Sequence, residues 1–338
     1  MAGINIKQLA EALNLSTSTI SRAFRNNSGI KQVTKDLILA KAKELNYQPN
    51  HYASSLRDQK GNTIAVIVPE LANNYFSQVI HGIEKVTKAK GYNILIYATD
   101  DDFEKEVDVI KHLHNGRAEG IIISVSGESK NHSYLNDFGA RRLPMVQFDR
   151  VYDDVNTPKI TTDDYHSSFV ATEHLIEQGC KRIGYLVVKS DASIGKTRER
   201  GYLDALAKHN IDFDERLIIG CSNSYEENDP IIKEALKTLQ LDGIFASVER
   251  LAFSTYYACH ALKIKIPKQL KVISFSSLEI APLLNPSLTT ITQPATEIGS
   301  LAAQLLFDIL SGKADATTVR EQVVLTSKII HRNSTKKS

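Results

Sequence analysis

Residues 44–57 read ELNYQPNHYASSLR, and this stretch separates two structured regions of the chain. Pro49 ends the preceding helix, because the residue before a proline is pushed out of the helical conformation. Asn50 can cap a new short helix from Tyr52 to Arg57, which has too few residues to be stable in isolation. The stretch therefore predicts a linker with one marginal helix.

Three short helices are predicted before the linker. Apolar residues recur at helical spacing from Ile6 to Leu13, and Asn14 tolerates the left-handed conformation of a tight turn. Ser16 is a good cap for a second helix from Thr17 to Phe24. A third amphipathic helix is expected from Gln32 to Asn46, with four residues packed underneath: Val33, Leu37, Ala40 and Leu45. Two helices joined by a tight turn and covered by a third form the helix-turn-helix plan. The alternative is a plain three-helix cap on an α/β protein.

The charge of the chain divides at the same linker. Residues 1–60 hold nine Lys and Arg against four Asp and Glu, a net charge of +5, whereas the rest of the chain carries −3. A basic head on a slightly acidic body favours a polyanionic partner at one end.

Size and composition exclude several classes of protein. A chain of 338 residues is expected to form two or three domains, and 42% hydrophobic with 24% charged residues is typical of a soluble globular protein. Apolar stretches such as 64–68 are too short to span a bilayer, and no secretory signal opens the chain. Cys180, Cys221 and Cys259 are scattered and form no CxxC pair, which favours a reducing compartment. The sequence therefore predicts a cytoplasmic protein without a membrane segment.

After Gly61 the chain alternates short β-branched runs with amphipathic helices, a pattern that predicts parallel sheets covered by helices on both faces. There are enough units for two doubly wound lobes, and 161–164 is expected to be the first crossover between them. The expected strands are 63–68, 93–97, 120–125, 144–148, 182–188, 243–247 and 271–275. The expected helices are 76–90, 103–115, 167–178, 197–209, 230–239, 251–262 and 295–310.

The chain resembles the LacI/GalR family of transcription regulators along nearly its whole length. In the head the similarity lies in LNLSTSTISRAF (13–24) and in ELNYQPN (44–50) with the Ala and Leu that follow. In the body it lies in VIVPELANNYF (66–76), QFDR (147–150), 161–186, RERGYLDAL (198–206) and LLNPSLTTITQP (283–294). The resemblance implies an α/β protein with an N-terminal all-α helix-turn-helix domain and two parallel-sheet lobes of periplasmic-binding-protein type.

The resemblance also implies a domain organisation and partners. Residues 1–48 would be the DNA-binding domain, 49–60 a hinge helix and linker, and 61–338 the effector-binding and dimerisation body. The N-lobe would hold about 61–162 and 292–325, and the C-lobe about 163–291. We expect a homodimer, on a palindromic operator, that acts as a repressor under the control of a small-molecule effector.

DNA contacts are expected from the second helix and the hinge. Short hydroxyls and an arginine suit base edges and phosphates in a major groove. The residues expected to read bases are Thr17, Ser18, Arg22 and Leu56, the last as an apolar wedge in the minor groove. Those expected to position the DNA backbone are Ser16, Ser21, Asn26, Tyr47, Ala53 and Arg57; Ala53 would also let two hinge helices approach closely.

Effector contacts are expected in the cleft between the lobes, at the carboxyl ends of the strands. An aromatic ring near the first strand could stack on a sugar ring or a planar base, and Arg198 could clamp a hydroxyl or a carboxylate with two donors. The candidates are Asn73, Tyr75, Phe76, Asp149, Arg198, Glu249, Ser276 and Gln293. For each, the alternative is a structural polar residue at a strand end.

Two positions depart from the sugar-responsive members of the family. The chain has Val248-Glu249 where those members commonly carry Asn-Asp, and Ser276 where they carry an Asp. Both lost groups normally accept hydrogen bonds from sugar hydroxyls. The chemical class of the effector is therefore left open between a sugar and another small molecule.

Other functions fit the sequence less well, and we expect no enzyme, no cofactor and no metal. Gly195-Lys196-Thr197 resembles the end of a phosphate-binding loop, but Ser190 stands where the loop needs glycine. His112 and His114 point to different faces of a helix, and His166 and His174 are expected to be solvent-facing or to interact with the helix dipole. A hydrolase would need a nucleophile motif that is not present. A solute-binding transport protein would need a signal peptide and no DNA-binding head.

Overall fold

The computed structural model describes residues 4–24, 29–47, 61–113, 117–126, 132, 134–136, 143–188, 193–314 and 322–337. Two compact units divide the chain, Met1–Gly61 and Asn62–Ser338. We call them the head and the body. The hinge predicted over 49–60 lies outside the described residues, so it stays a prediction.

The described residues of the head form three helices, α1 (Ile6–Leu13), α2 (Thr17–Phe24) and α3 (Gln32–Glu44). Asn5 and Gln8 form a capping box at the start of α1, and Asn14 ends that helix in the left-handed conformation expected for the tight turn. The core of the head is formed by six buried residues, Leu9, Ala10, Ile20, Ala23, Ile38 and Ala42.

Of the four residues expected to pack beneath α3, Leu45 packs against the core of the head, but Val33, Leu37 and Ala40 are exposed. Val33 is 81% exposed and Leu37 is 56% exposed, while Ile38 and Ala42 are buried instead. Apolar residues surround this helix on several sides, so the spacing of the sequence did not select one face.

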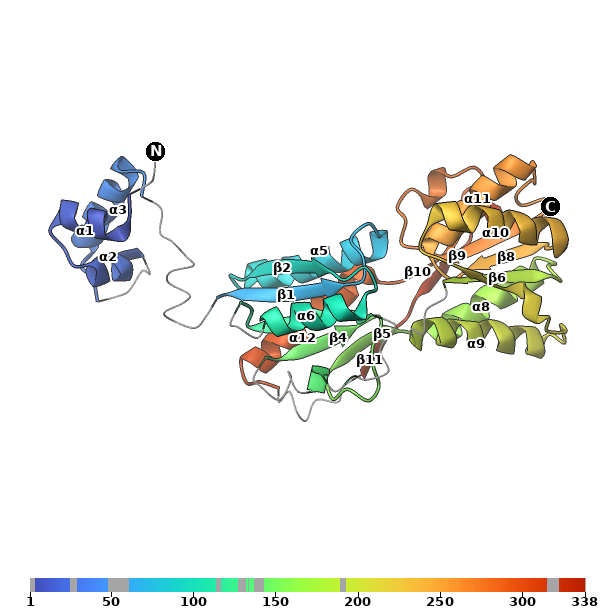
Figure 1. Cartoon of the computed structure of the whole chain (residues 1–338), viewed down its shortest axis with the longest axis horizontal. Helices are drawn as coiled ribbons and strands as arrows, with labels where there is room; N and C mark the ends of the chain where they lie inside the picture. The colour runs from blue at the N-terminus through green and yellow to red at the C-terminus, as the bar shows by residue number, and fades with distance from the viewer. Residues whose placement is uncertain are drawn as a thin grey trace. The chain divides into compact units, whose positions relative to one another are not determined.

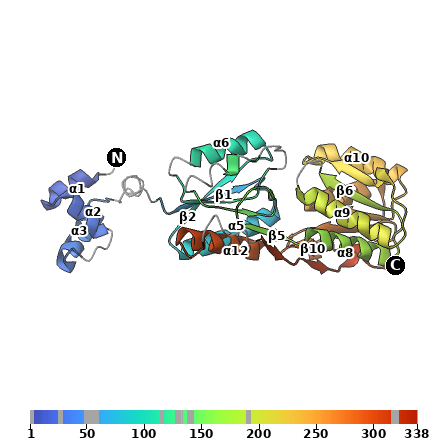
Figure 2. The ribbon, with the colours of Figure 1, turned by 90° about the horizontal axis from the view of Figure 1, so that it is seen from below.

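The body contains two six-stranded sheets (Figures 1 and 2). The first lobe has the strand order β11-β5-β4-β3-β1-β2 and the second has β12-β10-β9-β8-β6-β7. Every described pairing is parallel except that of β12 with β10. The fold class predicted from the sequence, a helical head with two parallel-sheet lobes, is confirmed. The strands are β1 (Thr63–Val68), β2 (Asn93–Ala98), β3 (Gly120–Ile123), β4 (Met145–Phe148), β5 (Lys159–Thr162), β6 (Ile183–Val188), β7 (Ile218–Cys221), β8 (Gly243–Ala246), β9 (Lys271–Phe275), β10 (Thr289–Thr292), β11 (Gln322–Leu325) and β12 (Lys328–Ile330).

Helices cover both faces of each sheet, as expected for doubly wound lobes. In the first lobe α5 (Asn74–Ala89) and α12 (Ala295–Leu310) pack on one face and α6 (Phe103–Leu113) on the other. In the second lobe α10 (Tyr225–Thr238) and α11 (Glu249–Leu262) cover one face, and α8 (Asp164–Glu177) and α9 (Ser193–Lys208) cover the other. Short 3-10 helices lie at Glu215–Leu217, Ala281–Leu283 and Asn333–Thr335.

The chain passes between the two sheets at three places: between β5 and α8, between β10 and α12, and between β11 and β12. We call these the crossovers. The first was expected at 161–164, but its residues up to Thr162 belong to strand β5.

Five strands and several helix starts escaped the sequence analysis. β5, β7, β10, β11 and β12 are each three or four residues long, too short for a periodic pattern. Helices α5, α8, α9, α10 and α11 begin two to five residues earlier than expected. α10 shows this best, because it was expected from Pro230 but begins at Tyr225, with the Ser224 side chain accepting from the Glu227 backbone N–H.

Candidate functional site

Helix α2 presents a polar surface on the head. Ile20 and Ala23 are buried against the other helices, and this orientation leaves Thr17, Ser18 and Arg22 exposed to solvent. Three of the residues predicted to read DNA bases therefore lie on one accessible helix.

Ser16 fixes the start of α2, as the sequence predicted. Its hydroxyl accepts a hydrogen bond from the Thr19 backbone N–H at 3.1 Å and is hydrogen-bonded to the Ser18 and Thr19 hydroxyls, both at 2.8 Å. A hydroxyl that caps a helix stabilises its first turn. The N–H groups of the first turn of α2 therefore lie at the surface, where they can bind an anion such as a phosphate.

The remaining DNA candidates divide into two groups. Ser21 is half-buried on α2, and Tyr47 is half-buried beside Phe24, with ring centroids 5.6 Å apart. The others lie outside the described residues: Asn26, Ala53, Leu56 and Arg57. All the DNA contacts stay predictions.

The body gathers polar side chains where its parallel strands end. Glu70 and Asn74 follow β1, Asp149 follows β4, Asn223 follows β7, and Ser276 follows β9. Hydrogen bonds join residues of the first lobe to residues of the second, as described below. We call this set of facing strand ends the interlobe site.

Asp149 is the most perturbed carboxyl group of the interlobe site. It has a left-handed backbone, with φ of 59°, directly after β4. Enclosure by the protein raises the pKa of Asp149 to about 6, despite the opposing charges of Arg150 and Arg198. The buried Tyr75 hydroxyl lies beside this carboxyl group and interacts with it. An acid with such a pKa can accept a hydrogen bond when ionised and donate one when protonated.

Arg198 is engaged inside the protein. It is 5% exposed, and its Nε donates to Asp164 Oδ1 at 2.7 Å while an Nη donates to the Ser247 carbonyl at 2.7 Å. Its guanidinium carbon lies 3.6 Å from the centre of the Phe275 ring. These contacts tie α9 to the first crossover, which the sequence analysis missed, and they occupy two of the donors that a clamp on an effector would use.

Glu249 and Ser276, the two positions that depart from the sugar-responsive pattern, are hydrogen-bonded to each other. The Ser276 hydroxyl donates to Glu249 Oε2 at 2.5 Å. The other carboxylate oxygen accepts from Asn74 Nδ2 of the first lobe at 2.6 Å. One carboxylate therefore joins the two lobes.

A second polar link beside Glu249 was not predicted from the sequence. Arg250 forms an ion pair with Glu70, and its other terminal nitrogen donates to the Asn223 carbonyl at 3.1 Å. Asn223 Nδ2 in turn lies 3.5 Å from Asp101 Oδ2 of the first lobe. No single motif contains these residues together, because each follows a different strand.

Asn73, Phe76 and Gln293 have structural contacts of their own. The Asn73 side chain caps α5 and donates to Glu70 at 2.7 Å. Phe76 is 3% exposed and packs edge-on against Phe148. Gln293 Nε2 donates to the Thr162 hydroxyl at 2.9 Å and so joins two crossovers. Their roles toward an effector stay predictions.

Several buried hydroxyl groups at strand ends have no hydrogen-bond partner within the part of the chain that the structure describes. Two of them stand after β2 and β9: Thr99 and Ser277. Buried polar atoms are normally hydrogen-bonded, so such a group of unpartnered hydroxyls is expected where a polar ligand or ordered water binds.

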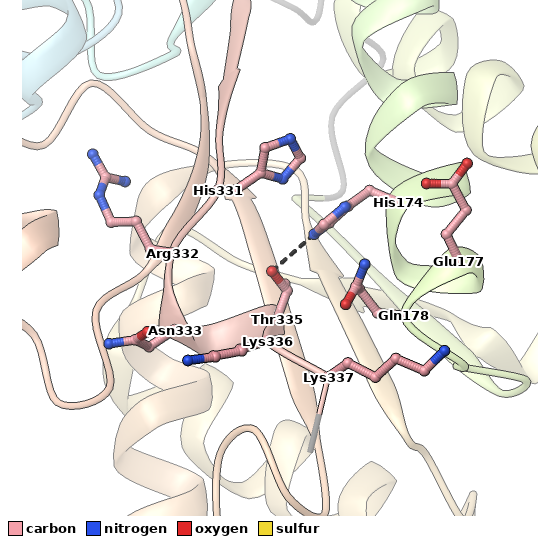
Figure 3. A pocket seen from close by; sticks show the side chains of 9 residues that line it. All are labelled: His174, Glu177, Gln178, His331, Arg332, Asn333, Thr335, Lys336 and Lys337. Atoms are coloured by element: carbon pink, nitrogen blue, oxygen red, sulfur yellow. Dashed lines mark hydrogen bonds between the residues drawn. The ribbon is translucent and has the colours of Figure 1, made fainter.

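A cavity of about 680 Å³ lies elsewhere in the second lobe, between the end of α8 and residues 331–337 (Figure 3). Of the two alternatives expected for His174, the solvent-facing one was wrong, because the side chain is 9% exposed; His174 does lie in the last turn of α8, as the helix-dipole alternative requires. His174 Nε2 is hydrogen-bonded to the Thr335 hydroxyl at 2.8 Å, and burial lowers the pKa of His174 to about 4, with a smaller contribution from His331. His166 is exposed, as expected.

The described ranges contain neither a metal-binding cluster nor a membrane-spanning helix. No three His, Cys, Asp or Glu side chains there are grouped so as to hold a metal ion. No helix there is both long and apolar enough to cross a bilayer. Gly195-Lys196-Thr197 lies inside helix α9.

Known protein families match both the head and the body. Residues 5–50 match the family described as bacterial regulatory proteins, lacI family, and residues 172–335 match the periplasmic binding protein-like domain. A ribose operon repressor of Halalkalibacterium halodurans is 27% identical over 333 residues, covering 98% of this chain and 97% of the repressor.

Two solved structures are also similar. The Lac repressor dimer bound to operator and an anti-inducer has a TM-score of 0.83 at 19% identity, with 99% of each chain covered. A periplasmic binding protein/LacI transcriptional regulator from Alkaliphilus metalliredigens, complexed with D-xylulofuranose, has a TM-score of 0.70 at 28% identity, with 81% of this chain and 98% of that chain covered.

The fold and the two surfaces define a class of protein, in which a helix-turn-helix head is joined to a two-lobed body of periplasmic-binding-protein type. Members of this class regulate transcription by binding DNA. Residues 5–50 carry the domain of the lacI family of bacterial regulatory proteins, and the chain is a transcriptional regulator of LacI type.

Proposed function

We propose that the chain is a repressor that binds a palindromic operator as a homodimer and responds to a small effector at the interlobe site. The observation that carries the proposal is the exposed polar face of α2 in a head that matches the LacI family. Two such heads in a two-fold dimer would enter major grooves one helical turn apart.

The contacts of the head are divided between bases and phosphates. Thr17, Ser18 and Arg22 would contact base edges, because they are exposed on α2 and Arg can donate two hydrogen bonds to a guanine. Ser16, Ser21, Asn26 and Tyr47 would hold phosphates. In the hinge, Ala53 and Arg57 would support Leu56, which would open a central pyrimidine–purine step from the minor groove.

The effector would be a small polar molecule with several hydroxyl groups. The unpartnered buried hydroxyls, and the carboxylates of Asp149 and Glu249, can accept hydrogen bonds from it. Tyr75, with its edge against Phe76, would contribute an aromatic surface. Sugar complexes of similar regulators support a sugar-like ligand. We also propose that the chain acts by binding alone and catalyses no reaction, because its relatives are regulators.

The dimer would form through exposed apolar residues. β2 is an edge strand of the first sheet, and Leu95 and Ile96 on it are 38% and 41% exposed; Leu71, which follows β1, is 52% exposed. Tyr257 and Leu283 are exposed on the second lobe, at 61% and 81%. An exposed apolar edge strand invites pairing with another chain, so we assign these two groups to a partner copy.

Fluorescence anisotropy with a palindromic duplex selected from random DNA tests the DNA-binding proposal. Arg22→Ala should weaken operator binding roughly 10- to 100-fold and leave binding to a scrambled duplex nearly unchanged. Arg200→Ala, which removes the same charge from an exposed position of the body, is the matched control. Equal binding of operator and scrambled duplex by the wild type would contradict sequence-specific recognition.

Sedimentation tests the dimer surface separately. Leu95→Lys together with Tyr257→Glu should produce monomers, because charges would be buried in the contact. Phe213→Glu, at a residue 47% exposed outside both groups, should leave the dimer intact. A dimer that survives the first pair would show that the copies meet elsewhere.

A further inference from the structure

The two lobes of the body are joined by their own side chains. Glu249 contacts Asn74 of the first lobe and Ser276 of the second, at 2.6 and 2.5 Å. Arg250, the next residue along α11, is paired with Glu70 of the first lobe. Gln78 Nε2 on α5 donates to the Ser277 carbonyl at 2.8 Å.

The place of Glu249 makes it the centre of these links. It is the first residue of α11, directly after the turn that follows β8, so its carboxylate stands at a strand end of the second sheet. Both of its oxygens accept hydrogen bonds, one from each lobe. A hydroxyl-rich ligand bound at the same site would present its own donors and acceptors to these partners.

The ion pair of Arg250 with Glu70 is more enclosed than the hydrogen bond between Glu249 and Asn74. The Arg250 and Glu70 side chains are 29% and 25% exposed, and Asn73 also donates to Glu70. This pair therefore holds α11 against the residue that caps α5, whereas Asn74 is exposed and its contact with Glu249 can be displaced. The Glu249 contact is the one that a ligand can replace at small cost.

We propose that Glu249 acts as a built-in ligand, which bridges the lobes and keeps the body closed without an effector. The inference rests on the proposed function of the interlobe site, and it adds the regulation of that site. An effector then binds by replacing Glu249 between Asn74 and Ser276, and it shifts the lobes only by its different affinity for the bridged and unbridged arrangements.

Single-molecule energy transfer between the lobes tests this in the full-length protein with neither DNA nor effector. Lys88→Cys on α5 and Lys237→Cys on α10 are exposed labelling positions, one on each lobe. The native cysteines are buried, and burial raises the pKa of the Cys180 and Cys259 thiols to about 12, so they should react slowly. Sparse labelling gives one labelled subunit per dimer.

The protein with an unsubstituted Glu249 bridge should give one dominant population, in which the lobes are closed. Glu249→Ala and Asn74→Ala should each raise the ratio of open to closed molecules roughly threefold to tenfold, as expected for one exposed hydrogen bond to a charged group. The double variant should match either single variant, because all three remove the same contact. Glu249→Gln keeps the size of the side chain and one acceptor oxygen. Its ratio of open to closed molecules should lie between that of the alanine variants and that of the unsubstituted protein.

Glu234→Gln, at an exposed position of α10 outside the interlobe site, is the control and should change nothing. The proposal is overturned if Asn74→Ala leaves the populations unchanged, or if the two alanine substitutions add to each other. Asn74→Ala keeps Glu249 in place, so the test stands even where Glu249→Ala fails to fold. Since the readout contains no DNA, failure of the bridge leaves operator binding untouched, and failure of operator binding leaves the bridge untouched.

Discussion

The two lobes of the body share one strand order, but the contacts between their paired helices differ in polarity. In the first lobe α5 and α12 meet at two glycines: a Cβ added to Gly299 would lie 2.0 Å from the Val79 carbonyl oxygen, and one on Gly82 would lie 2.2 Å from that of Thr296. In the second lobe α8 and α9 also meet at a glycine, Gly201, but beside it they bury the Arg198–Asp164 ion pair.

This difference shows that a shared topology does not prescribe the polarity of an interior. The α5–α12 contact is backbone against backbone, so it depends on volume and little on charge. The α8–α9 contact depends on both, because a buried charge that loses its partner is strongly destabilising. The charged contact also lies next to the first crossover, because Asp164 accepts hydrogen bonds from both Arg198 and Thr162.

The largest expected effect is the loss of the buried ion pair of the second lobe. Arg198→Ala should lower the free energy of unfolding by about 4 kcal/mol, because it leaves Asp164 buried without a cation. Urea unfolding measures the change. Arg200→Ala removes a neighbouring arginine whose side chain is 78% exposed and should cost less than about 0.5 kcal/mol. Similar losses in the two variants would mean that the buried pair has no special weight.

The next effect is on the first lobe. Gly299→Ala should lower the free energy of unfolding by about 3 kcal/mol, because the new methyl group must push the α5 backbone away. The melting curve and urea midpoint both report it. A loss under about 1 kcal/mol would show that α5 and α12 can move apart easily, and the contrast between the lobes would then disappear.

The pH dependence should have opposite signs in the two lobes. The pKa of Asp149 is raised to about 6, so the folded state holds the extra proton between about pH 4 and 6. The stability that this group contributes is therefore lost as the pH rises through that window. The pKa of His174 is lowered from 6.5 to about 4, so the unfolded state holds the extra proton, and its contribution is lost as the pH falls from 6.5 to 4.

Two substitutions separate these contributions. As the pH rises from 4 to 7, the free energy of unfolding of Asp149→Asn should increase relative to that of the parent. That of His174→Gln should decrease relative to the parent, and each change should be on the order of 2 kcal/mol. Unfolding free energies at half-unit pH steps give both slopes. Slopes of the same sign would refute the assignment of one raised acid and one neutral buried histidine.

The smallest effect sharpens the comparison of glycines. Gly195 lies inside α9, and a Cβ added there would meet no atom within 4 Å. Gly195→Ala should therefore stabilise the protein by about 0.5–1 kcal/mol, through the lower entropy of the unfolded chain. Calorimetry would measure a rise in Tm, and a fall instead would show that the space around α9 is not open.

Much of the fold could be predicted from the sequence. α1 and α2 have the predicted bounds, because apolar spacing, the turn at Asn14 and the cap at Ser16 agree with one another. β1, β9 and α12 also have the predicted bounds. The short strands β7, β10, β11 and β12 were missed, because three or four residues carry too little pattern and their pairing comes from neighbours far along the chain.

The candidate site was predictable in position but not in its contacts. The sequence placed Asp149, Arg198, Glu249, Ser276 and Gln293 at strand ends, and the fold brings strand ends from both sheets together. The partners could not be predicted, because Asn74 and Glu249 are 175 residues apart and nothing local distinguishes Asn74 from Asn73.

The sequence by itself determined the class of protein: the three-helix head with its exposed hydroxyls and arginine, the alternation of strands and helices, and the separation of a basic head from an acidic body. These depend on local spacing and composition, which a single chain displays directly. The tertiary structure alone decided which groups are enclosed and what they bind. It buried His174 against Thr335, used two donors of Arg198 inside the protein, and gave Glu249 a partner on each lobe. Such properties depend on the surroundings that distant segments create, and a one-dimensional pattern does not contain them.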